Sequence, residues 1–138
     1  MVKNKRFVKR FVNHLFGVYN VPRIPVYVHY GYPACVDPGG NSCFGVYCYE
    51  QGSNGCIHIA GDIGTTTIMT VFAHEFVHYV QRMKGRDMED TEAIERDAEY
   101  WTAFLMGKWL IIKWREGEKV KKRFGVAPIW EEAPGCGD

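Results

Sequence analysis

The segment GTTTIMTVFAHEFVHYVQRMKG, residues 64–85, constrains the fold more than any other part of the chain. Its threonines at 65–67 can supply an N-cap hydroxyl, and Gly85 is a typical residue just beyond a helix end, so we predict a helix over residues 66–84. At about 100° per residue, His74, Glu75 and His78 share one face of that helix. Two ionisable rings and a carboxylate on one face are costly to bury without a use, which favours a functional site over an ordinary buried helix.

The spacing of the two histidines suits a metal ion. His74 and His78 are one helical turn apart, so both rings can reach a single ion, and a catalytic zinc site adds a third protein ligand and a water molecule. Glu75 is placed to receive a proton from that water. The alternative is a buried helix whose histidines are hydrogen-bonded to neighbouring groups.

The third ligand is expected from the next helix, which we predict over residues 91–115. Its sequence TEAIERDAEYW places Glu92, Glu95 and Glu99 on one side. If the two helices run side by side in opposite directions, Glu95 lies level with His78, and Glu99 lies nearer the level of the first histidine. All three glutamates are candidates on this reasoning.

The motif HEFVH followed by ERDAE resembles the gluzincin zinc metallopeptidases, which carry HExxH and a later ExxA[DE]. It is also similar to ImmA/IrrE-like proteins and, in chain length, to the single-domain minigluzincins. The resemblance covers roughly residues 68–106. It implies a zinc-dependent endopeptidase acting on peptide or protein substrates, with His74, His78 and Glu95 as zinc ligands and Glu75 as general base. It also implies that Glu99, where one family pattern has Asp, orients a histidine ligand.

The same resemblance implies that the strand preceding the HExxH helix, residues 56–60, borders the cleft and pairs with extended substrate. His58 on that strand, with Tyr79 and Tyr100 beside the ligand positions, can face the cleft, although ordinary packing explains each of them as well. Two alternatives to a general peptidase are a regulatory protein that uses the same metal site on one partner and a non-enzymatic module with structural zinc.

The remaining segments predict an α+β fold of minimal zincin type. Apolar residues between Phe7 and Phe16 form one stripe of an N-terminal helix that Gly17 should stop. Strands are expected at residues 26–30, 43–49 and 56–60, the last two paired as a hairpin around QGSNG. We therefore predict a small twisted sheet packed on the helix carrying HExxH and on the long glutamate-bearing helix.

Length and composition limit the classes of protein. At 138 residues we expect a single domain over 1–138 with an irregular tail from about 124, and no apolar run is long enough to span a membrane. The basic start reads as a docked helix, so we predict no nucleic-acid partner. No secretory signal is evident, which makes a cytoplasmic location the default. Oligomeric state and cleavage preference are not predicted.

Five cysteines are many for a cytosolic protein, and this count suggests either an exported protein or a thermophile's cytoplasm. They are Cys35, Cys43, Cys48, Cys56 and Cys136. Cys48 and Cys56 flank the hairpin turn and can form a cross-strand disulfide, but four cysteines in this region allow three connectivities. Cys136 lies in the tail APGCGD, from which a thiolate can occupy the open zinc position and keep the enzyme latent.

Overall fold

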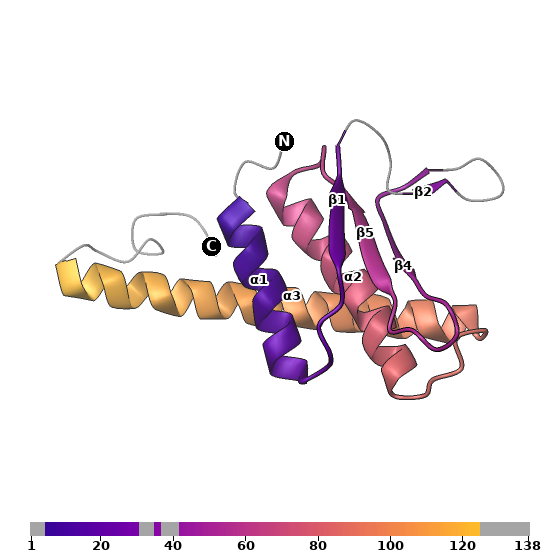
Figure 1. The fold of residues 1–138 in the computed structure, drawn as a ribbon. Coiled ribbons are helices and arrows are strands. Elements are labelled where there is room, and N and C mark those ends of the chain that lie inside the picture. Colours follow the sequence, from indigo (N-terminus) through magenta and orange to yellow (C-terminus); the bar gives the residue numbers. More distant parts are fainter. Residues whose placement is uncertain (1–4, 31–34, 37–41, 125–138) are drawn as a thin grey trace. The chain divides into compact units, whose positions relative to one another are not determined.

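The computed structural model describes residues 5–30, 35–36 and 42–124 and confirms the α+β class (Figure 1). Its elements, in chain order, are α1 (Lys5–Tyr19), β1 (Val26–His29), β2 (Cys35–Val36), β3 (Ser42–Cys43), β4 (Gly45–Cys48), β5 (Cys56–Ala60), α2 (Thr65–Met83) and α3 (Thr91–Phe124). The chain divides into two compact units, residues 1–106 and 107–138, and α3 contributes to both. The candidate site lies entirely in the first unit.

The main sheet has the strand order β1-β5-β4. β4 and β5 pair antiparallel, as the predicted hairpin requires, with Cys48 directly opposite Cys56. β1 pairs with the other side of β5 in parallel. The expectation that residues 56–60 form the edge strand is therefore wrong, because β5 is held on both sides and carries the fully buried Ile57 and Ile59. The edges of this sheet are β1 and β4.

Helix α1 is longer than predicted, because it continues through Gly17 to Tyr19. A glycine inside a helix costs only about 1 kcal/mol, and the helix buries one apolar stripe that includes Phe11 and Phe16. The turn that follows has Asn20 in the left-handed region at φ 49°, a conformation that asparagine tolerates better than most residues.

Helix α2 begins without the predicted threonine cap: its N-cap is Gly64, which makes no side-chain cap bond. Its C-terminus follows the prediction. Gly85 has φ 79°, the Gly85 N–H donates to the Arg82 carbonyl, and the Arg86 N–H donates to the Gln81 carbonyl. These two bonds form a Schellman motif, which ends the helix and turns the chain toward α3.

Helix α3 extends beyond the predicted residue 115 to Phe124. The added segment, EGEKVKKRF, contains no proline and is rich in glutamate and lysine, which favour helix. Glu116, the first residue of this segment, forms an i,i+3 ion pair in which its Oε2 lies 2.9 Å from Lys113 Nζ. The predicted irregular tail otherwise lies outside the described residues.

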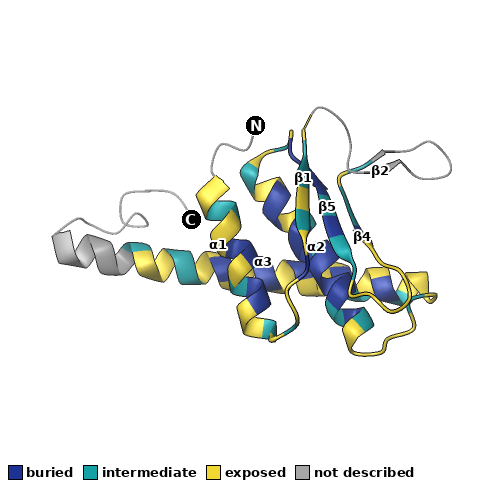
Figure 2. Cartoon of the chain, in the orientation of Figure 1, coloured by how far each residue is buried: buried dark blue, intermediate teal, exposed yellow. Residues whose placement is uncertain are grey.

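The core of the first unit lies between the two helices α1 and α2 and the sheet, as the buried residues in Figure 2 show. Phe16 of α1 packs edge-on against Phe76 of α2, with ring centroids 5.2 Å apart, and Phe11 meets Phe72 in the same way at 6.1 Å. No helix in the described ranges is both long and apolar enough to cross a membrane.

The cysteines differ in state. Cys43 is disulfide-bonded, and β2 places Cys35 opposite it in register. Cys48 and Cys56 face each other as the hairpin predicts, but both are free thiols, so the cross-strand disulfide is not formed in this structure.

Candidate metal centre

Three predicted site residues meet where α2 and α3 cross. His74 Nε2 lies 2.9 Å from Glu95 Oε2, His78 Nε2 lies 2.9 Å from Glu95 Oε1, and the two imidazole nitrogens are 3.1 Å apart. Ligands bound tetrahedrally at about 2.0–2.1 Å are roughly 3.3 Å from one another, so a small outward shift of these atoms accommodates a zinc ion. Within the described part of the chain, this is the one group of three or more histidine, cysteine or carboxylate side chains whose ligand atoms, as they stand, all lie within 4.8 Å of one another.

The helices reach this arrangement differently from the side-by-side packing considered above. In Figure 1 the start of α3 crosses α2 instead of running along it. At such a crossing only a short stretch of each helix is in contact, so a single glutamate is brought to both histidines. That residue is Glu95, and its side chain is 48% exposed where those of His74 and His78 are 26% and 9% exposed. The cluster is therefore closed on the α2 side and open at the carboxylate.

Gln81, which sequence reasoning missed, determines how His78 presents its ring. The buried Gln81 Nε2 donates to the Ile94 carbonyl at 3.1 Å, so its Oε1 faces His78 Nδ1 at 2.9 Å. An amide oxygen only accepts, and His78 Nδ1 therefore carries the proton. In the neutral ring this leaves the Nε2 lone pair directed at the carboxylate of Glu95. Two sets of lone pairs facing each other repel, and a cation between them removes the repulsion.

Glu75 lies beside the cluster on the inner side. Its Oε1 accepts a hydrogen bond of 3.1 Å from the Tyr47 backbone N–H, and the side chain is buried. Burial raises the pKa of the Glu75 carboxyl above its ordinary value, and the Glu95 carboxylate adds to this rise, whereas His78 and the Tyr47 hydrogen bond oppose it. A carboxyl with a raised pKa is a better proton acceptor once ionised.

Strand β4 forms the wall opposite these carboxylates. The Ala60 N–H donates to the Phe44 carbonyl, so the hydrogen-bonded pairs with β5 involve the even-numbered residues. The backbone groups of Gly45 and Tyr47 therefore face away from β5, toward the open edge. That edge, not β5, borders the site, and Tyr47 already uses its outward N–H to hold Glu75.

A cleft of about 340 Å³ opens at this edge. It is lined by Gly45, Val71, His74, Glu75 and Glu95. His74, Glu75 and Glu95, three of the four predicted site residues, therefore share one solvent-accessible space. The fourth, His78, does not line the cleft but contacts Glu95.

The other sequence candidates lie elsewhere. Glu92 and Glu99 are exposed, and neither belongs to the ligand cluster found among the described residues. The expectation that Glu99 orients a histidine is wrong for His78, since Gln81 does so. Tyr79 is fully buried and its hydroxyl donates a hydrogen bond to the Pro22 carbonyl, so it is a packing residue and does not face the cleft. Tyr100 is exposed.

His58 does not face the cleft. It lies on the face of β5 opposite the buried isoleucines, where its ring stacks on Tyr27 and His29 with centroids 5.1 Å and 5.0 Å away. The Cys136 latch lies outside the described residues.

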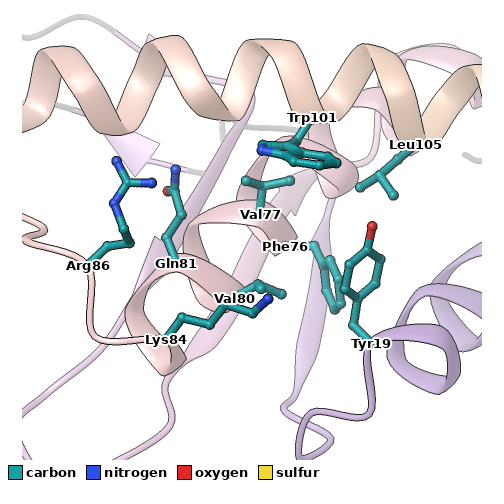
Figure 3. A pocket seen from close by; sticks show the side chains of 9 residues that line it. All are labelled: Tyr19, Phe76, Val77, Val80, Gln81, Lys84, Arg86, Trp101 and Leu105. Atoms are coloured by element: carbon teal, nitrogen blue, oxygen red, sulfur yellow. The ribbon is translucent and has the colours of Figure 1, made fainter.

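A second hollow, of about 200 Å³, lies on another side of α2 and contains none of this chemistry (Figure 3). Trp101 and Leu105 of α3 lie over Phe76, Val77 and Val80 of α2, with Tyr19 at one side. Its lining offers no histidine, cysteine or carboxylate. The candidate metal ligands and the candidate general base lie instead at the cleft beside β4.

Comparison of the chain with protein-family models, with curated proteins and with solved structures found no match.

Proposed function

We propose that the protein is a zinc-dependent peptidase, with His74, His78 and Glu95 as metal ligands and Glu75 as general base. The observation that carries the proposal is the meeting of two imidazole nitrogens and a carboxylate from different helices, with ligand atoms all within 4.8 Å of one another. Two nitrogens and one carboxylate oxygen form a donor set typical of catalytic zinc. When bound there, zinc polarises a carbonyl group and makes water more acidic.

The chain's own residues supply the remaining steps. Gln81 holds the His78 ring so that Nε2 is the ligand atom. Glu75, fixed by the Tyr47 N–H, accepts a proton from the attacking water and passes it to the leaving amine. The outward backbone groups at Gly45 can pair with an extended peptide laid along β4, which orients the scissile bond over the cleft.

The open cleft favours this function over a structural zinc module. A structural site has four protein ligands and no free position, whereas three candidate ligands meet here and share a solvent-accessible space with Glu75. A buried general base beside the ligands has no purpose in a purely structural site.

The test combines metal analysis with cleavage of unstructured peptides. The purified chain should contain at least one equivalent of zinc and cleave the peptides. Glu75→Gln should keep the metal and lose cleavage by roughly 10²-fold or more, because proton transfer by a positioned base contributes on that order. Glu92→Gln, a change at an exposed glutamate outside the cluster, is the matched control and should cleave like the parent.

Cleavage that survives Glu75→Gln would contradict the assigned base. A zinc-loaded parent that cleaves no peptide would favour the regulatory alternative, in which the site acts on one bound partner.

A further inference from the structure

The outer face of the sheet carries a second group of metal-ligating side chains. Cys56 Sγ lies 3.3 Å from His58 Nε2, and His58 Nδ1 lies 2.7 Å from His29 Nε2. Cys48 is directly opposite Cys56 in the β4–β5 register, and both thiols are free. Residues 56 and 58 point away from the core, since Ile57 and Ile59 between and beyond them are buried. None of these side chains takes part in the proposed peptidase chemistry.

We propose that Cys48, Cys56 and His58 form a second metal site, specific for a thiophilic ion of the Zn²⁺ class and separate from the centre at His74, His78 and Glu95. The inference does not depend on the proposed function, because the two sites lie on different faces of the sheet and share no ligand.

The distance between Cys56 and His58 fits one ion. With Zn–S at about 2.3 Å and Zn–N at about 2.0–2.1 Å, tetrahedral angles place sulfur and nitrogen roughly 3.5 Å apart. The observed 3.3 Å is close to this value. The i,i+2 spacing on one strand keeps both side chains on the same face.

The cross-strand register brings in the second sulfur. Directly opposed residues of an antiparallel pair have Cβ atoms about 4.5–5.5 Å apart. Two thiolates on one zinc ion need sulfur atoms roughly 3.8 Å apart, which rotation of the exposed Cys48 side chain can provide. Both cysteines also line one hollow at the surface, so an ion can reach them from solvent.

His29 prepares His58 for this role. When His58 carries its proton on Nδ1 and donates to His29 Nε2, the Nε2 lone pair of His58 is directed at the Cys56 sulfur. Burial, with the nearby His29, lowers the pKa of His58, which agrees with a neutral ring. The Tyr27 ring stacked on His58 limits its rotation.

Cobalt distinguishes the two sites by spectroscopy. Only a site with thiolate ligands gives a sulfur-to-cobalt charge-transfer band in the near ultraviolet, and the centre at His74, His78 and Glu95 contains no sulfur. The full chain carrying Cys136→Ser, prepared without reductant so that the Cys43 disulfide stays intact, is titrated with Co²⁺. The band should saturate by two equivalents of added Co²⁺, because the centre at His74, His78 and Glu95 takes up one equivalent without producing this band.

Variants then assign the ligands. Cys48→Ser and Cys56→Ser should each abolish or strongly weaken the band, and His58→Ala should lower cobalt affinity at least tenfold. His29→Ala should weaken binding roughly 10–100-fold without removing the band, as expected for a partner behind a ligand. His74→Ala combined with His78→Ala is the matched control and should leave the band unchanged.

A second measurement needs no substitution. Zinc should protect Cys48 and Cys56 from alkylation in the unaltered chain, as read by peptide mass spectrometry. The proposal is overturned if the titration gives no band, if a band persists in the Cys48→Ser/Cys56→Ser protein, or if zinc gives no protection. It is equally overturned if peptide mapping finds the two cysteines joined in a disulfide and the protein gives no sulfur-to-cobalt band.

Discussion

At the scale of single residues, the proposed metal centre depends on one chain of hydrogen bonds that connects α2 to α3. The Ile94 carbonyl fixes the amide of Gln81, and that amide fixes the proton on His78 Nδ1. Ile94 is the residue immediately before Glu95 in α3, so the same contact that orients one ligand also positions the other.

The choice among the three glutamates is tested by matched substitutions. Glu95→Gln should lower zinc affinity by more than the roughly 10–100-fold that is typical for loss of a partner behind a ligand, because an anionic ligand itself is lost. Glu99→Gln and Glu92→Gln should bind zinc like the parent, since both side chains are exposed and outside the cluster. Competition with a chromogenic chelator measures all three, in the Cys48→Ser/Cys56→Ser background that removes the second proposed site. Weaker binding by the Glu99 variant than by the Glu95 variant would reverse the assignment.

The sequence alone pointed to the candidate ligands and the candidate base of this centre, but not to Gln81, which orients the His78 ring. His74, Glu75 and His78 follow from helical spacing, and Glu95 ranked first only through the resemblance, since spacing left three glutamates open. Gln81 carried a usable signal, namely its place three residues after His78 on the same helix. Its role nevertheless depends on where the carbonyl of Ile94 lies, which is a tertiary fact that periodicity does not contain.

At the scale of elements, the site requires β4 to approach α2 very closely, and Gly45 makes this possible. A Cβ atom at position 45 would lie 2.3 Å from Val71 Cγ1 and 3.3 Å from Glu75 Cγ. Any side chain there would push the strand away from the helix, and with it the Tyr47 N–H that holds Glu75.

A double-mutant cycle tests this close approach. Gly45→Ala should destabilise the protein by about 1–3 kcal/mol, as overpacking usually does, and should reduce cleavage. Val71→Ala removes Cγ1, the atom that the new methyl group at position 45 would overlap. The double variant Gly45→Ala/Val71→Ala should therefore be more stable than Gly45→Ala, even though Val71→Ala alone destabilises the parent. Urea unfolding of the four proteins gives the coupling energy. Additive effects would show that the steric contact does not decide the cost.

The elements themselves were predicted with uneven success. The hairpin and the end of α2 follow from local turn chemistry at residues 51–55 and at Gly85. The central position of β5 does not, because the parallel pairing with β1 joins segments about thirty residues apart and is set by burial of Ile57 and Ile59. Gly17 was wrongly expected to stop α1 because a local propensity was weighed without the tertiary packing of Phe16, which outweighs it.

At the scale of the whole molecule, both proposed metal sites lie in the unit of residues 1–106, and each joins two different elements of secondary structure. The first links α2 to the start of α3, and the second would link β4 to β5. Their ligands converge only in the folded state, so a metal ion bound at either site stabilises that state over the unfolded chain.

This linkage gives a prediction for the centre at His74, His78 and Glu95. In a Cys48→Ser/Cys56→Ser background, which removes the second site, zinc at 100 times its dissociation constant should add about 2.7 kcal/mol to the free energy of unfolding. Calorimetry should show a rise of several degrees in Tm that a chelator reverses. Glu75→Gln should keep the rise, because that residue is not a ligand, and His78→Ala should lose it. An equal rise in the His78→Ala protein would place the stabilising zinc elsewhere on the molecule.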